Sequence, residues 1–216
     1  MATKRSRLIF KPLVFLVSLI PLGWIVFAIW SDTSLGTRYM TSDPTQKLNR
    51  ELGDWALIFV IVTLAVRPAA QVLKTPEIVS YRRMIGLFAF FYALLHLSSY
   101  IGFDLQLNLN ELIQDVIKRT YITIGMLAFI CLLPLAITST RGMIKRLGSR
   151  RWLKLHMLIY LISILGAFHF YMMVRAGFAR PMTYASIIVL LLGYRVWESR
   201  RKAAAKALRR KRASAT

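Results

Sequence analysis

The sequence predicts an all-α integral membrane protein, a bundle of six transmembrane helices with both termini in the cytoplasm. Two compositional extremes point to this class: 56% of the 216 residues are hydrophobic, yet the formal net charge is +21. Only 18% of the residues are charged, so long uncharged runs must separate the basic clusters. A nucleic-acid-binding protein would carry its basic residues on a compact polar domain, and no segment supplies one.

The candidate spans are apolar segments, because a bilayer core about 30 Å thick requires about 20 helical residues. Four runs of that length lack Asp, Glu, Lys and Arg: residues 12–31, 84–103, 120–140 and 155–174. Two shorter runs, 55–66 and 181–194, become full spans if Arg67 and Arg195 extend their side chains toward the headgroups. The single Cys131 lies within an apolar run, which excludes a disulfide framework and a cysteine-based metal site.

The charge distribution gives the orientation, since basic residues concentrate on the cytoplasmic side of short loops. With six spans, most of the 30 Lys and Arg fall on the inner side and most of the nine Asp and Glu fall outside. We therefore expect three regions: a basic cytoplasmic N-terminus (1–11), a six-span domain (12–197) and a basic cytoplasmic tail (198–216). The first span has no small-residue cleavage site and should be retained, with a kink at Pro21.

Apolar residues recur at helical spacing between the third and fourth spans, at Leu109, Leu112, Ile113, Val116 and Ile117. Polar residues, among them Asp115, are expected on the opposite face. This pattern predicts a short amphipathic helix on the outer side of the membrane. The helix is either an interfacial connector or a docking face for an outside partner.

The chain has three histidines, and all lie in or at the edge of predicted spans: His96, His156 and His169. At about 1.5 Å per residue, His96 lies roughly 20 Å beyond Arg83, and His169 roughly 22 Å beyond Lys154. These two imidazoles are therefore at similar depth on different helices. His156 lies about 20 Å lower, near the inner surface.

Ionisable side chains inside a bilayer usually bind a cofactor or metal, or form a proton path. Two imidazoles at one depth suit axial ligation of a b-type heme iron. A proton relay, a small metal site and hydrogen-bonded structural histidines remain open. His169 follows His156 by 13 residues, so on a regular helix their side chains point roughly 140° apart. Two hemes would therefore have to lie on different sides of this helix, or the helix would have to be distorted between the two histidines.

Three segments carry a family resemblance: Arg82 to Leu87 continuing to His96-Leu97, Trp152 to His156, and His169-Phe170. On these residues the chain resembles the ferric-reductase-like transmembrane family, over nearly its whole length and without an appended dehydrogenase domain. The resemblance implies a multi-pass protein of the bacterial inner membrane, with His96, His156 and His169 as heme-iron ligands. It also implies FMN, for which no loop carries a Gly-rich phosphate motif.

The same resemblance implies specific partners. Electrons would come from the quinone pool or a cytosolic flavin reductase, and would pass to a periplasmic molybdopterin-containing reductase that repairs methionine sulfoxide in proteins. Membrane lipid is the remaining partner, and no nucleic acid is expected. The chain would then be an electron-transfer subunit of an oxidoreductase system rather than its catalytic subunit.

The chain departs from the wider family at one position, because Arg83 stands 13 residues before His96 where a second histidine is usual. We therefore expect one heme b between His96 and His169, and leave open a second at His156 with Met84 or Met157 as a weak partner. Arg83 and Arg175 are candidates for the heme propionates, since guanidinium groups bind carboxylates bidentately. Membrane topology alone would also place arginines on the inner side.

Three functional hypotheses follow. The leading one is a cytochrome b that relays electrons from the cytoplasmic side to a periplasmic partner. The second is a stand-alone transmembrane ferric or quinone reductase that acts at its outer face. The third is a proton channel or carrier that uses the membrane histidines.

Overall fold

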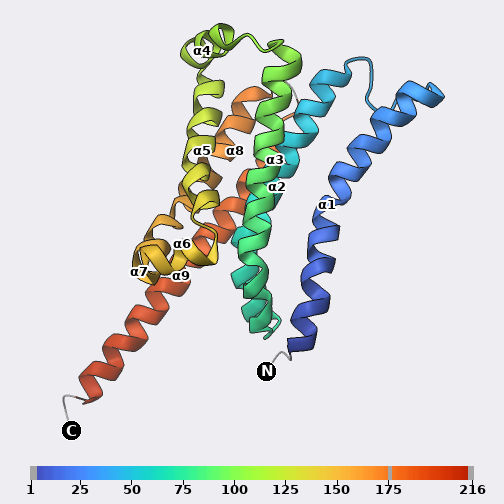
Figure 1. The fold of residues 1–216 in the computed structure, drawn as a ribbon. Helices are drawn as coiled ribbons and strands as arrows, with labels where there is room; N and C mark the ends of the chain where they lie inside the picture. The colour runs from blue at the N-terminus through green and yellow to red at the C-terminus, as the bar shows by residue number, and fades with distance from the viewer. Residues whose placement is uncertain (1–3, 175–176, 214–216) are drawn as a thin grey trace.

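A computed structural model describes residues 4–174 and 177–213, and every regular element within these ranges is helical. The long helices run side by side, with both ends of the chain at the same end of the bundle and α4 across the other end (Figure 1). The elements are α1 (Lys4–Leu35), α2 (Pro44–Val72), the 3-10 helix η1 (Pro76–Tyr81), α3 (Arg82–Ser99), the π-helical η2 (Tyr100–Asp104), α4 (Leu109–Lys118), α5 (Thr120–Ile137), α6 (Arg141–Leu147), α7 (Ser149–Leu155), α8 (Leu158–Met173) and α9 (Ala179–Ala213).

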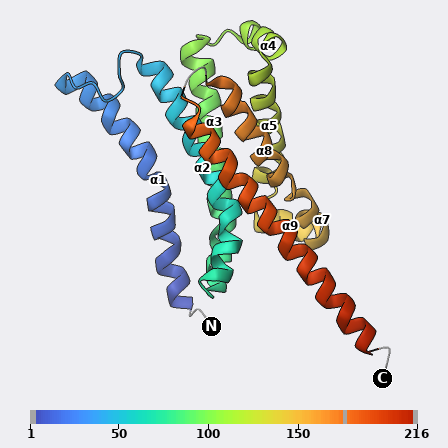
Figure 2. The same ribbon diagram turned by 180° about the vertical axis from the view of Figure 1, so that it is seen from behind.

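Five helical stretches in the described chain are long and apolar enough to cross a membrane: Phe10–Leu35, Pro44–Val72, Pro76–Asp104, Thr120–Ile137 and Ser149–Met173. They contain or overlap the first five predicted spans. The sixth predicted span, 181–194, lies within α9, which is not one of the five. Seen from behind, α9 crosses the bundle obliquely and continues beyond it (Figure 2). Six spans and the side on which the termini lie stay predictions.

Two predicted boundaries are wrong. The fourth span was expected to continue to residue 140, but α5 ends at Ile137. The Thr138 and Ser139 hydroxyls donate to the carbonyls of Pro134 and Leu135, each at 2.6 Å, and so satisfy the last turn. The fifth span was expected to be one helix over 155–174, but the chain breaks between α7 and α8, at His156 and Met157.

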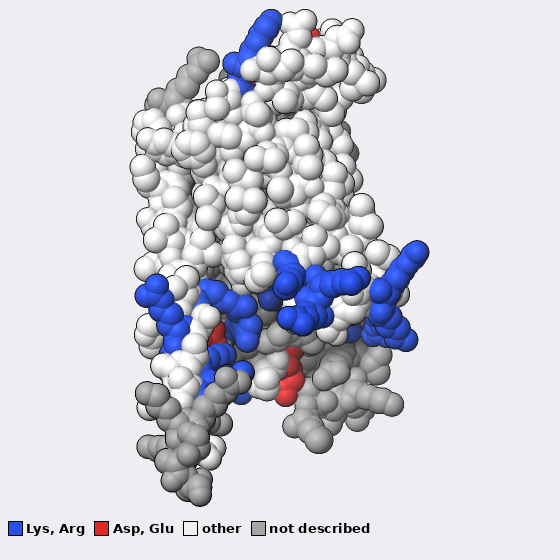
Figure 3. All heavy atoms as spheres, turned by 90° about the vertical axis from the view of Figure 1, so that its left-hand side faces the viewer, with Lys and Arg blue, Asp and Glu red and all other residues white. Residues whose placement is uncertain are grey.

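Basic side chains gather toward the end of the bundle that carries α6 and α7. On the face drawn in Figure 3, a broad uncharged surface separates them from the few charges at the α4 end. Large apolar side chains such as Leu16 and Ile20 of α1 are exposed on the outside, as expected of helices that face lipid.

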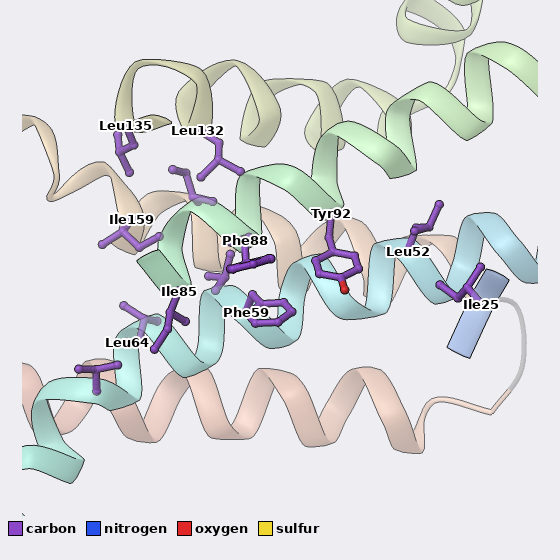
Figure 4. Close-up of a cluster of buried hydrophobic side chains, with 14 of the residues drawn as sticks. Ile25, Leu52, Phe59, Leu64, Ile85, Phe88, Tyr92, Leu132, Leu135 and Ile159 are labelled. Carbon is purple, nitrogen blue, oxygen red and sulfur yellow. The ribbon is translucent and has the colours of Figure 1, made fainter. Parts of the chain in front are cut away.

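The core lies where α2 and α3 meet. Phe59 of α2 stacks on Phe88 and on Tyr92 of α3, with ring centroids 5.6 and 5.2 Å apart (Figure 4). Tyr92 is fully buried. Stacked aromatic pairs add stability beyond the apolar area that they bury. The α2–α3 pair is therefore the scaffold against which the other helices pack.

The Tyr92 hydroxyl also holds α1. It donates to the Ser18 carbonyl at 2.8 Å and accepts from the Leu22 amide at 3.2 Å. In a regular α-helix the Leu22 amide would donate directly to the Ser18 carbonyl. The Tyr92 hydroxyl is therefore inserted into the hydrogen-bond ladder of α1. The insertion lies beside Pro21, which has no amide proton to donate and for which the sequence predicts a kink.

Tyr92→Phe should destabilise the protein, because it removes the group that satisfies both the Ser18 carbonyl and the Leu22 amide. We expect a loss of about 1–3 kcal/mol in the free energy of unfolding. Thermal unfolding in detergent measures it, with Tyr39→Phe as the control, since Tyr39 is half exposed. Equal stabilities of the two variants would contradict this role of Tyr92.

Candidate functional site

Two of the three histidines face each other between α3 and α8. The ring centroids of His96 and His169 are 6.3 Å apart, and the ring planes are inclined at 74°. The two residues therefore share one depth in the bundle, as the count of helical residues predicts. Both lie toward the end that carries α4.

Each imidazole is fixed by a backbone carbonyl on a neighbouring helix. Nδ1 of His96 is 2.9 Å from the Asn49 carbonyl of α2, and Nδ1 of His169 is 2.6 Å from the Tyr121 carbonyl of α5. A carbonyl only accepts, so we assign the proton of each ring to Nδ1. That leaves a lone pair on each Nε2, and no described residue bonds either one. This is the tautomer of a metal-ligating histidine whose second nitrogen is held by an outer partner.

Glycines let the neighbouring helices approach both rings closely. A Cβ atom at Gly125 of α5 would lie 2.7 Å from Nδ1 of His169, and one at Gly53 of α2 would lie 3.1 Å from Nδ1 of His96. Any larger residue at Gly125 would have to displace the His169 ring. A Cβ atom at Gly166 of α8 would lie 3.2 Å from Leu57 of α2, so this glycine serves the contact between α8 and α2.

The spacing of the pair fits two ligands of one metal. An imidazole nitrogen binds a transition metal at about 2 Å, so two rings on opposite sides of one ion have centroids roughly 6 Å apart. Among the described residues, no group of three or more His, Cys, Asp and Glu side chains converges on a possible metal position. The pair therefore suits an iron whose other ligands come from a macrocycle, as in a protein with two axial imidazoles.

His156 does not join this pair. It caps α7 at the break before α8, and its ring stacks on Trp152 with centroids 3.9 Å apart. Nδ1 lies 3.1 Å from the Trp152 carbonyl, and Nε2 is buried without a hydrogen-bond partner. A buried polar atom without a partner is costly, so its presence calls for a physical explanation such as a bound water or ion. The break between α7 and α8 at His156 is a helical distortion of the kind that a second heme beside His156 would require.

Of the other predicted site residues, those that the structure describes lie away from the pair. Arg83 is in the first turn of α3, 13 residues before His96 and so roughly 20 Å from it. Arg175 lies outside the described residues. Met84 packs against the apolar core, and Met157 is exposed. Neither methionine is a hydrogen-bond partner of His156 among the described residues, and Arg83 lies at the other end of α3 from His96.

A polar cluster ties α4 to both histidine-bearing regions. Asp115 accepts hydrogen bonds from the Tyr100 hydroxyl and from Nε of Arg119, the latter at 2.9 Å. Tyr100 follows His96 by one helical turn, and Arg119 precedes Tyr121, whose carbonyl holds His169. The amphipathic helix at Leu109–Lys118 is confirmed, but Asp115, expected on its polar outer face, is buried.

Comparison with known proteins identifies the family. The profile of the family described as "Ferric reductase like transmembrane component" matches residues 52–167, which include His96 and His156. The chain is 46% identical to a protein of Caulobacter vibrioides named "Protein-methionine-sulfoxide reductase heme-binding subunit MsrQ", over 88% of both chains. A protein of the same name from Polaromonas naphthalenivorans is also 46% identical, over 89% of this chain and 86% of its own length.

A longer relative contains the same unit. The magnetosome protein MamZ of Paramagnetospirillum magneticum is 40% identical over 92% of this chain, which corresponds to 31% of MamZ.

The chain therefore belongs to the ferric-reductase-like transmembrane family, as a helical multi-pass membrane protein, for which the bacterial inner membrane is a fitting location. Within that family it belongs with the MsrQ heme-binding subunits.

The sequence did not point to several residues of the site. Gly53, Gly125 and the carbonyls of Asn49 and Tyr121 act through backbone position, which no side-chain pattern reveals. Glycine within an apolar helix at the depth of a predicted histidine is the one signal that could have found Gly53 and Gly125.

Asp115→Ala should loosen α4, because it leaves Tyr100 and Arg119 without their shared acceptor. We expect about 1–3 kcal/mol lower local stability, seen as roughly tenfold or more faster hydrogen exchange in residues 109–118. The control is Glu111→Ala, an exposed acid on the same helix. If both variants exchange like the wild type, Asp115 does not hold α4.

Proposed function

We propose that the chain is the heme-binding, electron-transfer subunit of a methionine-sulfoxide reductase system and relays electrons across the inner membrane. The observation that supports this most is the facing pair His96 and His169, each with Nδ1 on a carbonyl and Nε2 unbonded. The names of the relatives, which describe heme-binding subunits of such a reductase, support it independently.

The residues present fit a heme b. His96 and His169 would be its axial ligands, and a heme held there would supply one-electron redox chemistry. The carbonyls of Asn49 and Tyr121 keep each imidazole in the ligating tautomer. Asn49 also donates from Nδ2 to the His96 carbonyl and to Ser99, which fixes the α2–α3 contact beside the ring.

His156 has a separate role in this proposal. Its buried Nε2 is available at the other end of α8, at the level of the basic residues. The absence of a described second ligand beside it favours one heme on the His96–His169 pair, with His156 free to bind a different group.

The partners are proposed from the family. A periplasmic molybdopterin-containing subunit of the MsrP type would accept the electrons, and the quinone pool or a cytosolic flavin reductase would supply them, with FMN as an associated cofactor. The α4 end is the natural acceptor side, because the histidine pair lies toward it. Exposed apolar residues on α4, among them Leu109, Ile113 and Ile117, would lie at that surface.

A stand-alone ferric or quinone reductase is the second candidate, favoured by the description of the matching family. An assay of the purified protein with a chemical reductant distinguishes the two proposals. Fast reduction of a ferric chelate without a partner favours the second. Reoxidation that depends on an MsrP-type subunit and methionine sulfoxide supports the first.

His96→Ala and His169→Ala should each abolish the b-type absorbance, because each removes one of two axial ligands. The reduced-minus-oxidised spectrum and the heme-to-protein ratio measure this in the purified protein. His156→Ala is the internal control and should keep both the b-type absorbance and the heme-to-protein ratio. A ratio halved by His156→Ala would show a second heme there, and full retention of heme in His96→Ala would contradict the proposed ligand pair.

Gly125→Ala should displace His169 and lose most of the bound heme, since its Cβ would lie 2.7 Å from the ring. Gly53→Ala should cause a smaller loss, because the corresponding distance is 3.1 Å. Gly193→Ala is the control, as nothing lies within 4 Å of its Cβ position. The same heme-to-protein ratio is measured. Equal heme content in all three variants would contradict the close packing around the rings.

A further inference from the structure

One acidic side chain connects α3 to α5 just beyond the histidine pair. Asp115 belongs to α4, which lies across this end of the bundle (Figure 1). Its Oδ2 accepts a hydrogen bond from the hydroxyl of Tyr100, the residue after α3, and its Oδ1 accepts from Nε of Arg119, the residue before α5, at 2.9 Å. The two oxygens of one carboxylate therefore serve two different helices.

The burial of Asp115 is the reverse of what hydrophobic packing would select. Within α4, which the structure describes in full, Asp115 alone is buried, whereas Leu109, Ile113 and Ile117 are exposed. Removing an acid from water is costly unless it is paired and hydrogen-bonded, and an apolar side chain would gain more from the same position. The position of Asp115 is therefore explained by its polar contacts.

On the α3 side, Tyr100 connects Asp115 to His96. The Tyr100 amide donates to the His96 carbonyl, which also accepts from Oγ of Ser99 at 2.9 Å and from Nδ2 of Asn49 at 3.2 Å. At Tyr100 the helix widens into the π-helical η2, a rare turn that is frequent at functional sites. Asp115 thus fixes the residue whose amide closes on His96.

On the α5 side, Arg119 and Tyr121 connect Asp115 to His169. The Arg119 amide donates to the Asp115 carbonyl at 2.9 Å, and Nη1 of Arg119 donates to the Tyr121 hydroxyl at 3.4 Å. Tyr121 contacts His169 twice, because its carbonyl accepts from Nδ1 and its ring centroid lies 6.3 Å from that of the imidazole. The segment that pairs with Asp115 is therefore the segment that orients His169.

The spacing of the two rings depends on how the α2–α3 pair meets the α5–α8 pair. His96 is bonded to α2 and His169 to α5, so a shift between these helix pairs would change the distance between the two Nε2 atoms. Phe90 of α3 stacks on Phe129 of α5 with centroids 5.8 Å apart, but Phe90 lies six residues before His96, roughly 9 Å nearer the basic end. Asp115 joins the same two helices on the other side of the rings.

We propose that Asp115 is a positioning residue that keeps His96 and His169 at the spacing and inclination needed to ligate one metal. This inference rests on the proposed heme function and gives α4 a role beyond connecting two spans. Hydrogen bonds to an ionised group are roughly twice as strong as neutral ones, so a carboxylate suits this role. Loss of a group that orients metal ligands from outside typically lowers metal affinity by about 10- to 100-fold.

The first measurement is the dissociation constant of heme, titrated into the full-length, heme-free protein in detergent and followed by Soret absorbance. Asp115→Ala should weaken heme binding about tenfold or more. Asp115→Asn should keep most of the affinity, because its Oδ1 can accept from Arg119 while its Nδ2 donates to the Tyr100 hydroxyl. Tyr100→Phe, which removes that hydroxyl, should also weaken binding. Glu111→Gln, at an exposed acid of α4, is the matched control and should bind heme like the wild type.

The second measurement is made without heme. The chain has three histidines, so the ring-nitrogen signals of isotope-labelled histidine can be resolved by NMR and assigned with single His→Ala variants. In the wild type, His96 and His169 should each show one tautomer, with the proton on Nδ1. Asp115→Ala should shift or broaden these two signals, whereas Asp115→Asn and Glu111→Gln should leave them unchanged.

The two readouts distinguish positioning of the histidines from simple attachment of α4. Faster hydrogen exchange in residues 109–118 of Asp115→Ala, with unchanged heme affinity and unchanged histidine signals, would overturn the proposal. Thermal unfolding shows whether each variant is folded. If Asp115→Ala is not, Tyr100→Phe makes the same test, and wild-type affinity and signals in that variant would overturn the proposal.

Failure of the proposed heme function has a different signature. The wild type would then bind no heme, or His96→Ala would bind it equally well. The histidine signals of the heme-free protein would still show whether Asp115 holds the pair.

Discussion

The hydrogen bond from Nδ1 of each paired histidine to a carbonyl of the neighbouring helix is the interaction on which the site depends. It joins α3 to α2 through Asn49 and α8 to α5 through Tyr121. Because the same bond fixes the tautomer, it also leaves Nε2 of both rings able to ligate a metal. Close approach of these helices requires glycine at Gly53 and Gly125, so packing and ligand geometry are set together.

The two ends of the bundle are built for different chemistry. The neutral histidine pair lies toward α4, where Asp115 connects that helix to Tyr100 and Arg119. The other end concentrates basic residues, among them Arg67, Arg82 and Arg195 around one small cavity, and the unbonded Nε2 of His156. The proposed relay of electrons across the membrane requires a different partner on each side, and this polarity provides two distinct surfaces.

Much of the fold follows from the sequence, because apolar length and charge asymmetry are local properties. The shared depth of His96 and His169 follows from the helical rise alone. The burial of Asp115, the inward direction of Arg67 and Arg195, and the glycine contacts depend on which helix faces become neighbours. Those contacts are tertiary, and a single sequence does not encode them in any short pattern. The break at His156 was likewise missed, since its residues are apolar enough to continue a helix.

The most direct measurement is the electron paramagnetic resonance spectrum of the oxidised, heme-loaded wild-type protein. Two axial imidazoles from His96 and His169 predict a low-spin ferric signal, with the strong anisotropy expected of steeply inclined ring planes. A high-spin signal from an iron with one protein ligand, in protein whose heme content is stoichiometric, would contradict the paired-histidine site.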